Sequence, residues 1–474
     1  MSTNEYDLVV LGGGTGGYVA AIRASQLGMK VAVVEKDKLG GTCLHRGCIP
    51  SKALLRSAEV YHTVTQGPEF GVEVSNISIN FLKMMERKQK IVDQLHQGVQ
   101  YLMKKGNITV FQGDGRVLGS SIFSPQAGAV SVMRMDGDSE ILVPKNLLIA
   151  TGSRPSKLTG LEVDGISVIT SDEALQLESL PKSILVVGGG VIGIEWASLL
   201  NDFGVDVQIV EFADRILPLE DAEISKEMTR LLKKRKIQIH TGAKVLPETF
   251  SKESETVTIQ VDKNGGLITL QAEKILVAVG RSANVENIGL ENTEVRVEKN
   301  VIQVNEYFQT EESHIYAIGD VIGGLQLAHV ASHEGILAVE HMAGLAPHLI
   351  DYTMVPKVTY SRPEIASVGW TEEEAKHKGF SIKTGLFPFK AIGKALIFGE
   401  HDGFVKLVVD EKTDNLLGVH MIGPHVSDLI AEGALAKVLD ATPWEIAQTI
   451  HPHPSLAEII GEAALAVERI AIHS

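Results

Sequence analysis

Two stretches of this sequence carry the same pattern, and this repeat constrains the fold more than any other feature. In each, a short β-branched apolar run leads into G-x-G-x-x-G, a helical stretch follows, and a second apolar run ends in glutamate. The glycines and the acid are Gly12, Gly14, Gly17 and Glu35 in the first copy and Gly188, Gly190, Gly193 and Glu211 in the second. The first glycine and the acid are 23 residues apart in both copies. The repeat predicts two βαβ dinucleotide-binding units.

Each position in the motif has a physical reason. Gly12 and Gly188 permit a tight turn out of the strand. Gly14 and Gly190 let backbone amides approach a pyrophosphate at a helix N-terminus, where the helix dipole favours an anion. The third glycine of each copy allows close helix–strand packing, and the glutamate accepts hydrogen bonds from ribose hydroxyls. One such motif is weak support, and two α/β units that bind no ligand remain the alternative, which the duplication disfavours.

Two units predict two cofactors, one a tightly held flavin (FAD) and the other an exchanging nicotinamide. The carboxylate of Glu211 repels a 2′-phosphate, which favours NAD over NADP. Arg215 lies four residues later and would weaken that preference.

The rest of the chain predicts a third domain. Apolar runs at residues 147–155 and 275–281 are expected to be strands that close the two nucleotide domains, and Asp320 ends a further strand at residues 314–320. After residue 351, alternating runs such as residues 404–410 predict antiparallel strands, with helices near 427–439 and 456–470. We expect an α/β protein with two Rossmann-like domains and a C-terminal α+β dimerisation domain. The expected parts are residues 1–150 and 280–350 for FAD, 151–279 for NAD, and 351–474 for the interface.

Composition excludes several classes of protein. A chain of 474 residues exceeds one hydrophobic core, and 44% apolar with 22% charged residues is typical of a globular protein. A net charge of −15 argues against nucleic acid or anionic lipid as a partner. Two cysteines are too few for a secreted disulfide scaffold, and the polar residues 1–7 are typical of neither a signal peptide nor a membrane span. We expect a cytoplasmic protein with no metal site.

The two cysteines, Cys43 and Cys48, follow the first acid closely. On an ideal helix an i, i+5 pair would have Cα atoms roughly 8–9 Å apart, whereas a disulfide needs less than about 7 Å. A bond between them therefore requires a distorted backbone, which Gly47 permits. Strained disulfides tend to be working redox centres. Two ordinary reduced thiols are the alternative, and the adjacent flavin turn disfavours it.

A histidine near the C-terminus is suited to act as a base. Attack of a dithiol on a disulfide requires a thiolate, and histidine has a suitable pKa to accept the proton. His453 and Glu458 are five residues apart across an expected helix start, so they can form a pair of base and orienting acid. Pro452 and Pro454 stiffen the approach.

Residues 40–52 resemble the redox-active disulfide segment of the flavoprotein disulfide reductases, and the resemblance runs from Tyr6 to the C-terminus. It implies that Cys43 exchanges with substrate and that Cys48 lies against the flavin as the charge-transfer thiol. The family more often has Asn-Val where this chain has His45 and Arg46. Arg46 is expected to favour the thiolate and lower a cysteine pKa.

The resemblance also implies roles for residues elsewhere. His453 matches the base, Glu458 its partner and His451 a neighbouring non-catalytic histidine, and the base comes from the other subunit of a homodimer. Lys52 and Glu195 match a pair beside the flavin N5. The remaining expected cofactor contacts are Gly115, Thr151, Gly152, Ser153, Asp320 and Ala328 for FAD, and Val245 and Gly280 for NAD.

Several members of the family fit less well. Glutathione reductases have His-Pro-Thr rather than His-Pro-His-Pro at the base, and they favour NADP. Mercuric reductases and large thioredoxin reductases need additional cysteines near the C-terminus. A soluble transhydrogenase would lack the cysteine pair, and a non-catalytic assembly subunit would have lost Cys43, Cys48 or His453. The doubled His-Pro most resembles the members that oxidise dihydrolipoamide to lipoamide with reduction of NAD. The implied partners are dihydrolipoamide on a lipoyl domain and the acyltransferase subunit of a 2-oxoacid dehydrogenase complex.

Overall fold

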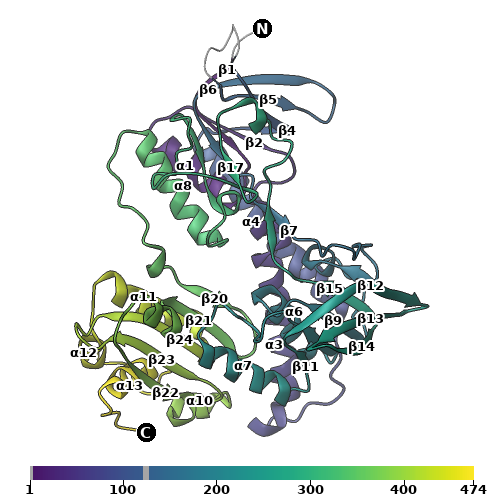
Figure 1. Ribbon diagram of the computed structural model, residues 1–474, viewed down its shortest axis with the longest axis vertical. Coiled ribbons are helices and arrows are strands. Elements are labelled where there is room, and N and C mark those ends of the chain that lie inside the picture. Colours follow the sequence, from purple (N-terminus) through teal and green to yellow (C-terminus); the bar gives the residue numbers. More distant parts are fainter. Residues whose placement is uncertain (1–3, 121–126, 474) are drawn as a thin grey trace. The chain divides into compact units, whose positions relative to one another are not determined.

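The computed structural model describes residues 4–120 and 127–473, so residues 1–3 of the polar N-terminal segment lie outside the described residues. The chain forms two compact units (Figure 1). Unit 1 comprises Met1–Leu54, Leu82–Ser156 and Arg281–Ile350, and unit 2 comprises Leu55–Phe81, Lys157–Gly280 and Asp351–Ser474. Within the described ranges, no helix combines the length and apolar character that a membrane span requires.

A seven-stranded sheet forms the centre of unit 1, in the order β3-β2-β1-β6-β5-β4 with β19 paired to β6. Strands β3, β2, β1, β6 and β19 pair in parallel. Strand β5 pairs antiparallel with both β6 and β4. The strands are β1 Asn4–Leu11, β2 Val31–Glu35, β3 Thr109–Gln112, β4 Asp114–Leu118, β5 Ala129–Met133, β6 Ser139–Ile149 and β19 Ile315–Ala317. The other elements are α1 Thr15–Gln26, α2 Gly41–Arg46, α3 Cys48–Thr65, α4 Phe81–Lys105, α8 Ala328–Met342, β7 Ser153–Pro155, β16 Arg281–Ala283, β17 Val297–Glu298, β18 Val301–Ile302, η2 Leu290–Asn292 and η3 Gly319–Ile322.

Both faces of this sheet are covered, which explains why β1 is apolar without alternation. Leu8 and Val10 pack into one core, while Val9 and Leu11 pack into a core on the opposite face. Helices α1 and α8 lie side by side over the first of these cores (Figure 1). The strand that leads into the first glycine turn is therefore packed on both faces.

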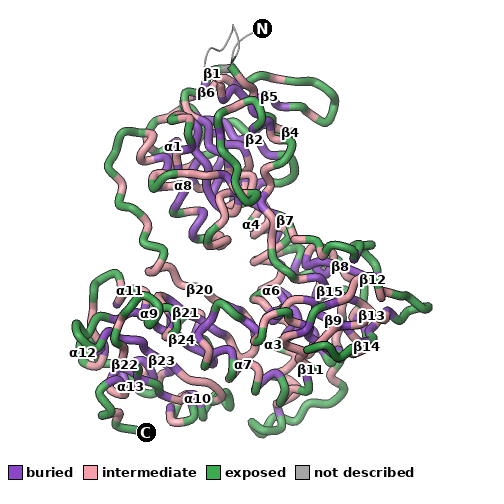
Figure 2. The backbone as a smooth tube through the Cα atoms, in the orientation of Figure 1, coloured by how far each residue is buried: buried purple, intermediate pink, exposed green. Residues whose placement is uncertain are grey.

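The second glycine motif belongs to a five-stranded parallel sheet of unit 2, in the order β11-β10-β9-β15-β8. A separate antiparallel sheet, β12-β13-β14, completes this part. Strands β9 and β10 of the parallel sheet are largely buried, whereas the end of β12 is exposed (Figure 2). The elements are β8 Val168–Ile169, β9 Ser183–Val187, β10 Asp206–Val210, β11 Gln238–His240, β12 Ala243–Glu253, β13 Thr256–Lys263, β14 Gly266–Ala272, β15 Lys274–Val277, α5 Ser171–Ala174, α6 Val191–Asp202, α7 Ala222–Lys234 and η1 Gly67–Phe70.

The C-terminal part of unit 2 is an antiparallel sheet covered by helices. Its order is β20-β21-β24-β23-β22. Phe387, Phe389 and Met421 are fully buried in its core, which α11 and α13 help to close. The elements are β20 Lys357–Thr359, β21 Glu364–Gly369, β22 Ile382–Pro388, β23 Phe404–Asp410, β24 Leu416–Gly423, α9 Glu372–His377, α10 Gly393–Phe398, α11 Val426–Val438, α12 Pro443–Gln448, α13 Glu458–Val467, η4 Tyr352–Met354 and η5 Phe389–Ala391.

The predicted fold class is confirmed, with local differences. The run at residues 147–155 is interrupted at Gly152, where φ is +68°, so it divides between β6 and β7. Strand β6 lies between β1 and β5, and β15 lies between β9 and β8. Strand β19 ends at Ala317, and Asp320 lies in the 3₁₀ turn that follows. The predicted domain boundaries stay a prediction.

Candidate active site

The two glycine turns have the same geometry. Gly12 and Gly188 have φ of +107° and +111°, and a Cβ on either would lie 2.3 Å from a carbonyl oxygen of the neighbouring strand. A Cβ on Gly17 would lie 1.9 Å from the Gly12 oxygen, and one on Gly193 would lie 1.9 Å from the Gly188 oxygen. Only glycine fits at these four positions, so the steric reasons predicted from the sequence apply to both copies.

The two acids are also held alike. Each carboxylate accepts hydrogen bonds from the backbone N–H of the residue directly after the first motif glycine and from that of the residue two positions after the acid. The donors are Gly13 and Asp37 for Glu35, both at 2.7 Å, and Gly189 and Ala213 for Glu211, at 2.6 and 2.7 Å. Burial raises the pKa of Glu35. A carboxylate has about four acceptor sites, so each acid keeps capacity for ribose hydroxyls.

Both turns end at a helix N-terminus that no side chain caps. Gly14 precedes α1 and Gly190 precedes α6, so the first backbone amides of these helices are free to bind an anion. A Cβ built on Gly190 meets no atom within 4 Å. Gly14 instead pairs with Gly40 through an isolated parallel bridge, and a Cβ on Gly41 would lie 2.6 Å from Gly14 Cα. Both turns fit a dinucleotide pyrophosphate, and the first lies against the cysteine segment.

The cysteine segment is a helix broken at Gly47. Helix α2 ends at Arg46 and α3 begins at Cys48, with Gly47 at φ −145° and ψ −117° between them. A Cβ on Gly47 would lie 3.0 Å from Thr42 O and 3.4 Å from Cys43 Cα. The break brings the two thiols within hydrogen-bonding distance of each other, and both cysteines are partly buried. The backbone distortion expected at Gly47 is therefore present.

Neighbouring groups control the ionisation of Cys43. The hydrogen bond with Cys48 and burial raise the pKa of the Cys43 thiol, while the Thr15 hydroxyl and the charge of Lys52 act to lower it. Arg46, from which this effect was expected, forms an ion pair with Asp37. Lys52 is thus the cation that favours the thiolate, because the charge of Arg46 is compensated at the surface.

The departure from the common Asn-Val is accommodated away from the sulfurs. His45 Nε2 lies 2.9 Å from Leu39 O, and His96 Nδ1 lies 2.9 Å from the same oxygen. The two imidazole rings meet edge to face, with centroids 5.1 Å apart. Burial lowers the pKa of His45. This side chain therefore connects the redox segment to α4.

A polar network in unit 1 surrounds Asp320. Ser153 Oγ donates a hydrogen bond to the Asp320 carboxylate. Arg281 Nε donates to Ser153 Oγ at 2.7 Å and lies 3.8 Å from Asp320 Oδ2. Asn284 fixes Thr151, donating from Nδ2 to Thr151 O at 2.9 Å. Arg281 and Asn284 were not predicted as site residues, although Arg281 is the last residue of the predicted run at residues 275–281.

Other predicted cofactor contacts occupy varied positions. Gly115 lies on β4, where a Cβ would be 2.3 Å from Leu11 Cδ1, so a larger residue there would require the Leu11 side chain to move. Ala328 is the first residue of α8. Val245 is buried in the core of unit 2, while Gly280 is exposed with φ +116°. Their contacts with cofactors stay predictions.

The predicted pair of base and orienting acid is formed in unit 2. His453 Nδ1 lies 2.8 Å from Glu458 Oε1, and Ser455 N donates to Glu458 Oε2 at 2.8 Å. Burial opposes ionisation of Glu458, but these hydrogen bonds hold its pKa below the ordinary value. The carboxylate fixes the Nδ1 side of the ring, an arrangement in which Nε2 could accept a proton. His453 is largely exposed.

The neighbouring histidine and the predicted flavin pair have their own partners. His451 Nε2 lies 2.8 Å from Glu432 Oε1, and this hydrogen bond raises the pKa of His451. Glu195 is buried in α6 and accepts a hydrogen bond from Tyr360 N at 2.9 Å. Lys52 belongs to unit 1 and Glu195 to unit 2, so their pairing stays a prediction. Among the described residues, no group of three His, Cys, Asp or Glu could hold a metal ion.

Comparisons with known proteins agree with this geometry. Residues 6–335 match the family described as pyridine nucleotide-disulphide oxidoreductase, and residues 355–464 match its dimerisation domain. Dihydrolipoyl dehydrogenase of Bacillus subtilis is 67% identical over 470 residues, which covers 99% of both chains. The mitochondrial dihydrolipoyl dehydrogenase of Pisum sativum is 40% identical over 474 residues, covering 99% of this chain and 93% of that one.

Among solved structures, LpdA from Mycobacterium tuberculosis has a TM-score of 0.89 at 26% identity, covering 98% of this chain and 99% of that one. The paired glycine turns and the cysteine segment thus occur in a chain whose relatives match it from end to end. The chain belongs to the pyridine nucleotide-disulphide oxidoreductases, a family that uses FAD and NAD, and it includes the family's dimerisation domain.

Proposed function

We propose that this chain is a dihydrolipoyl dehydrogenase, which oxidises dihydrolipoamide to lipoamide and reduces NAD to NADH. The observation that carries the proposal is the position of the Cys43–Cys48 pair. The thiols are held together by the break at Gly47, and Gly40 and Gly41 of the same segment lie against the first dinucleotide turn. The relatives that match this chain over its whole length bear this name.

The thiol chemistry follows from the residues of the chain. In the oxidised enzyme, a thiolate of dihydrolipoamide attacks Cys43, and the Cys43–Cys48 bond breaks with Cys48 leaving as thiolate. The second substrate thiolate then attacks the substrate sulfur of the mixed disulfide, which closes lipoamide and releases Cys43. His453 accepts the substrate proton, with Glu458 stabilising the charged ring. Two electrons and two protons leave the substrate: the cysteine pair receives the electrons, one proton stays on His453 and the other protonates the released Cys43 thiolate.

Bound FAD would supply two-electron exchange between the cysteine pair and NAD. The residues proposed to hold it are the first glycine turn with Glu35, Gly115, the Thr151–Ser153 segment, Asp320 and Ala328. The open second turn with Glu211, Val245 and Gly280 is proposed for NAD. Lys52 and Glu195 are proposed to support the flavin together.

The cysteine pair provides the decisive test. Purified enzyme should reduce NAD with dihydrolipoamide, and Cys43→Ser and Cys48→Ser should each abolish this reaction. Both variants should still oxidise NADH with ferricyanide, because that reaction needs no thiol. Reduction of glutathione disulfide with NADPH at a higher kcat/KM than the dihydrolipoamide reaction would contradict the proposal.

We propose further that the active enzyme is a homodimer in which His453 of one chain serves the Cys43–Cys48 pair of the other. Mixing His453→Gln with Cys43→Ser subunits then gives each mixed dimer one intact site, and activity should return to at most about half the native level. Absence of recovery, with subunit exchange shown independently, would place both groups of a site in one chain. The proposed substrate is dihydrolipoamide on a lipoyl domain, presented by the acyltransferase subunit of a 2-oxoacid dehydrogenase complex in the cytoplasm.

A further inference from the structure

The loop that follows Glu211 is folded back onto the second glycine turn. Ala213 N donates to Glu211 Oε1 at 2.7 Å, and Leu217 N donates to Gly189 O at 2.8 Å. Arg215 lies between these two anchored residues, four positions after the acid that we propose binds the ribose. The Arg215 side chain therefore extends from a loop that is hydrogen-bonded both to the Glu211 carboxylate and to the second glycine turn.

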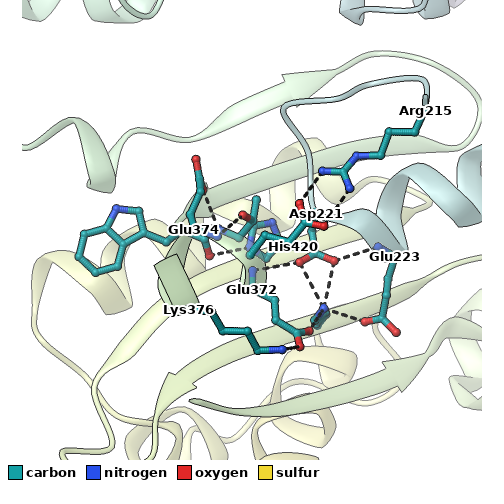
Figure 3. Close-up of polar contacts among 11 residues, drawn as sticks. Arg215, Asp221, Glu223, Glu372, Glu374, Lys376 and His420 are labelled. Atoms are coloured by element: carbon teal, nitrogen blue, oxygen red, sulfur yellow. Dashed lines mark hydrogen bonds and ion pairs between the residues drawn. The ribbon is translucent and has the colours of Figure 1, made fainter. Parts of the chain in front are cut away.

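The guanidinium of Arg215 is already engaged (Figure 3). Nη1 and Nη2 donate to the two carboxylate oxygens of Glu373, at 3.0 and 2.8 Å, and Nη2 also donates to Pro218 O at 3.3 Å. This two-point geometry matches the fork that a guanidinium offers to a carboxylate or a phosphate. The hydrogen bond lowers the pKa of Glu373. Glu373 therefore occupies the donors that a phosphate would need.

Glu373 lies in the first turn of α9, which several hydrogen bonds hold in place. Helix α9 begins with a capping box, in which Glu374 N donates to Thr371 Oγ1 at 3.1 Å and Thr371 N donates to Glu374 Oε2 at 2.9 Å. Glu372 accepts a hydrogen bond from the buried Lys406 at 2.7 Å. The residues on both sides of Glu373 are thus fixed, which presents its carboxylate to Arg215 without large motion.

The far end of the same loop is fixed to the same helix. Asp221 is 1% exposed, caps α7 through Glu223 N at 3.0 Å, and accepts a hydrogen bond from Glu372 N at 3.2 Å. Lys406 donates to both Asp221 oxygens, at 3.0 and 3.2 Å. The first turn of α9 therefore holds the nucleotide loop at Arg215 and at Asp221 (Figure 3).

We propose that Glu373 is a positioning residue for nucleotide specificity: by occupying the Arg215 guanidinium it denies the 2′-phosphate of NADP a cation beside Glu211. The inference rests on the proposed binding of the nicotinamide nucleotide at the second turn. It assigns part of the NAD preference to a residue of the C-terminal domain, 162 positions after the ribose-binding acid.

Binding of nucleotide fragments tests this without catalysis. The readout is the affinity of the FAD-containing dimer for adenosine 2′,5′-bisphosphate relative to 5′-AMP, measured by calorimetry at low salt. Glu373→Gln should raise this ratio about threefold to tenfold, because a freed arginine gains a partly exposed charge pair with the 2′-phosphate. The gain should shrink as salt rises from about 50 to 500 mM. The ratio of kcat/KM for NADP to that for NAD should rise in parallel, through KM.

Two further variants make the result specific. In an Arg215→Gln background, Glu373→Gln should leave the ratio unchanged, since Arg215 is the group that Glu373 acts through. Glu227→Gln is the matched control, because Glu227 holds Arg230 by the same two-point geometry at 2.8 and 2.9 Å. An unchanged ratio in Glu373→Gln, or an equal rise in the Arg215→Gln background, would overturn the proposal. Failure of the wild type to bind 5′-AMP would overturn nucleotide binding at this turn, and the inference with it.

Discussion

Lys406 is the buried charge whose removal should cost the most stability. Its side chain is 2% exposed and contacts the carboxylates of Asp221, Glu223 and Glu372. Burial alone would lower the pKa of Lys406, but the hydrogen bonds to Glu223 and Glu372 and the charge of Asp221 raise it. Lys406→Met removes the cation and leaves the Asp221 carboxylate buried, with only two backbone amides as donors.

Breaking a buried pair on one side typically costs about 3–5 kcal/mol. Because Asp221 keeps its two amide hydrogen bonds, we expect Lys406→Met to lie near the lower end, at about 3 kcal/mol. Lys383→Met is the control: Lys383 pairs with Asp414 and Glu468 at the surface, so its loss should cost less than about 1 kcal/mol. Urea unfolding at equal protein concentration and saturating FAD measures both.

The double variant Lys406→Met/Asp221→Asn isolates the unpaired charge. It should be at least about 1 kcal/mol more stable than Lys406→Met, because the asparagine is neutral and still accepts backbone hydrogen bonds. In the wild type, burial raises the pKa of Asp221, but the charge of His420 together with the charge and hydrogen bond of Lys406 holds that pKa below its ordinary value. The stabilisation is therefore complete above about pH 3.9 and lost as pH falls further. Lys406→Met should move this loss to higher pH. A cost below about 1 kcal/mol, or no recovery in the double variant, would refute the reasoning.

His453→Gln should lower dihydrolipoamide–NAD turnover by about 10²–10⁴-fold and leave NADH–ferricyanide turnover near the wild-type value; equal losses in both would exclude a base role. The lowered pKa of Glu458 means that its stabilisation is complete above about pH 4.3 and lost on acidification. Glu458→Gln should therefore flatten the acid limb of the stability curve, and an unchanged limb would contradict this. Gly193→Ala places a Cβ 1.9 Å from a turn carbonyl and should raise KM for NAD while FAD content per chain stays at one; the equivalent change in the first turn should instead lose FAD. Wild-type kcat/KM should favour NAD over NADP by at least about tenfold if Glu211 binds the ribose hydroxyls, and equal use of both would argue against that contact.

Features encoded in short segments of the chain were predictable from the sequence. The glycine turns need only a strand, a helix and tight backbone contacts within a few dozen residues, and both formed with matching geometry. The hydrogen bond between His453 and Glu458 joins residues five apart at a helix start, so the spacing alone indicated it. The break at Gly47 follows from the geometry of a disulfide compared with that of a helix.

Contacts between distant segments were not predictable in the same way. The Arg215–Glu373 ion pair joins residues 158 apart, and Lys406 and Asp221 are 185 apart. Each of these residues is of a charged type that is common on protein surfaces, and the neighbouring sequence does not predict its partner. Arg46 was misjudged for a related reason: its charge was expected to act on the cysteines beside it, but its guanidinium forms an ion pair with Asp37.

The different covers of the two turns have a kinetic consequence. Gly14 pairs with Gly40 through a parallel bridge and a Cβ built on Gly14 would lie 3.9 Å from Gly41 Cα, whereas a Cβ built on Gly190 would meet no atom within 4 Å. If the proposed nucleotides bind at these turns, we expect the one on the first turn to dissociate more slowly, because Gly40 and Gly41 of the cysteine segment lie against that turn. Gly190 has no such neighbour, so we expect a nucleotide on the second turn to exchange faster. The same backbone motif would then hold FAD as a retained cofactor in one copy and NAD as a diffusing co-substrate in the other.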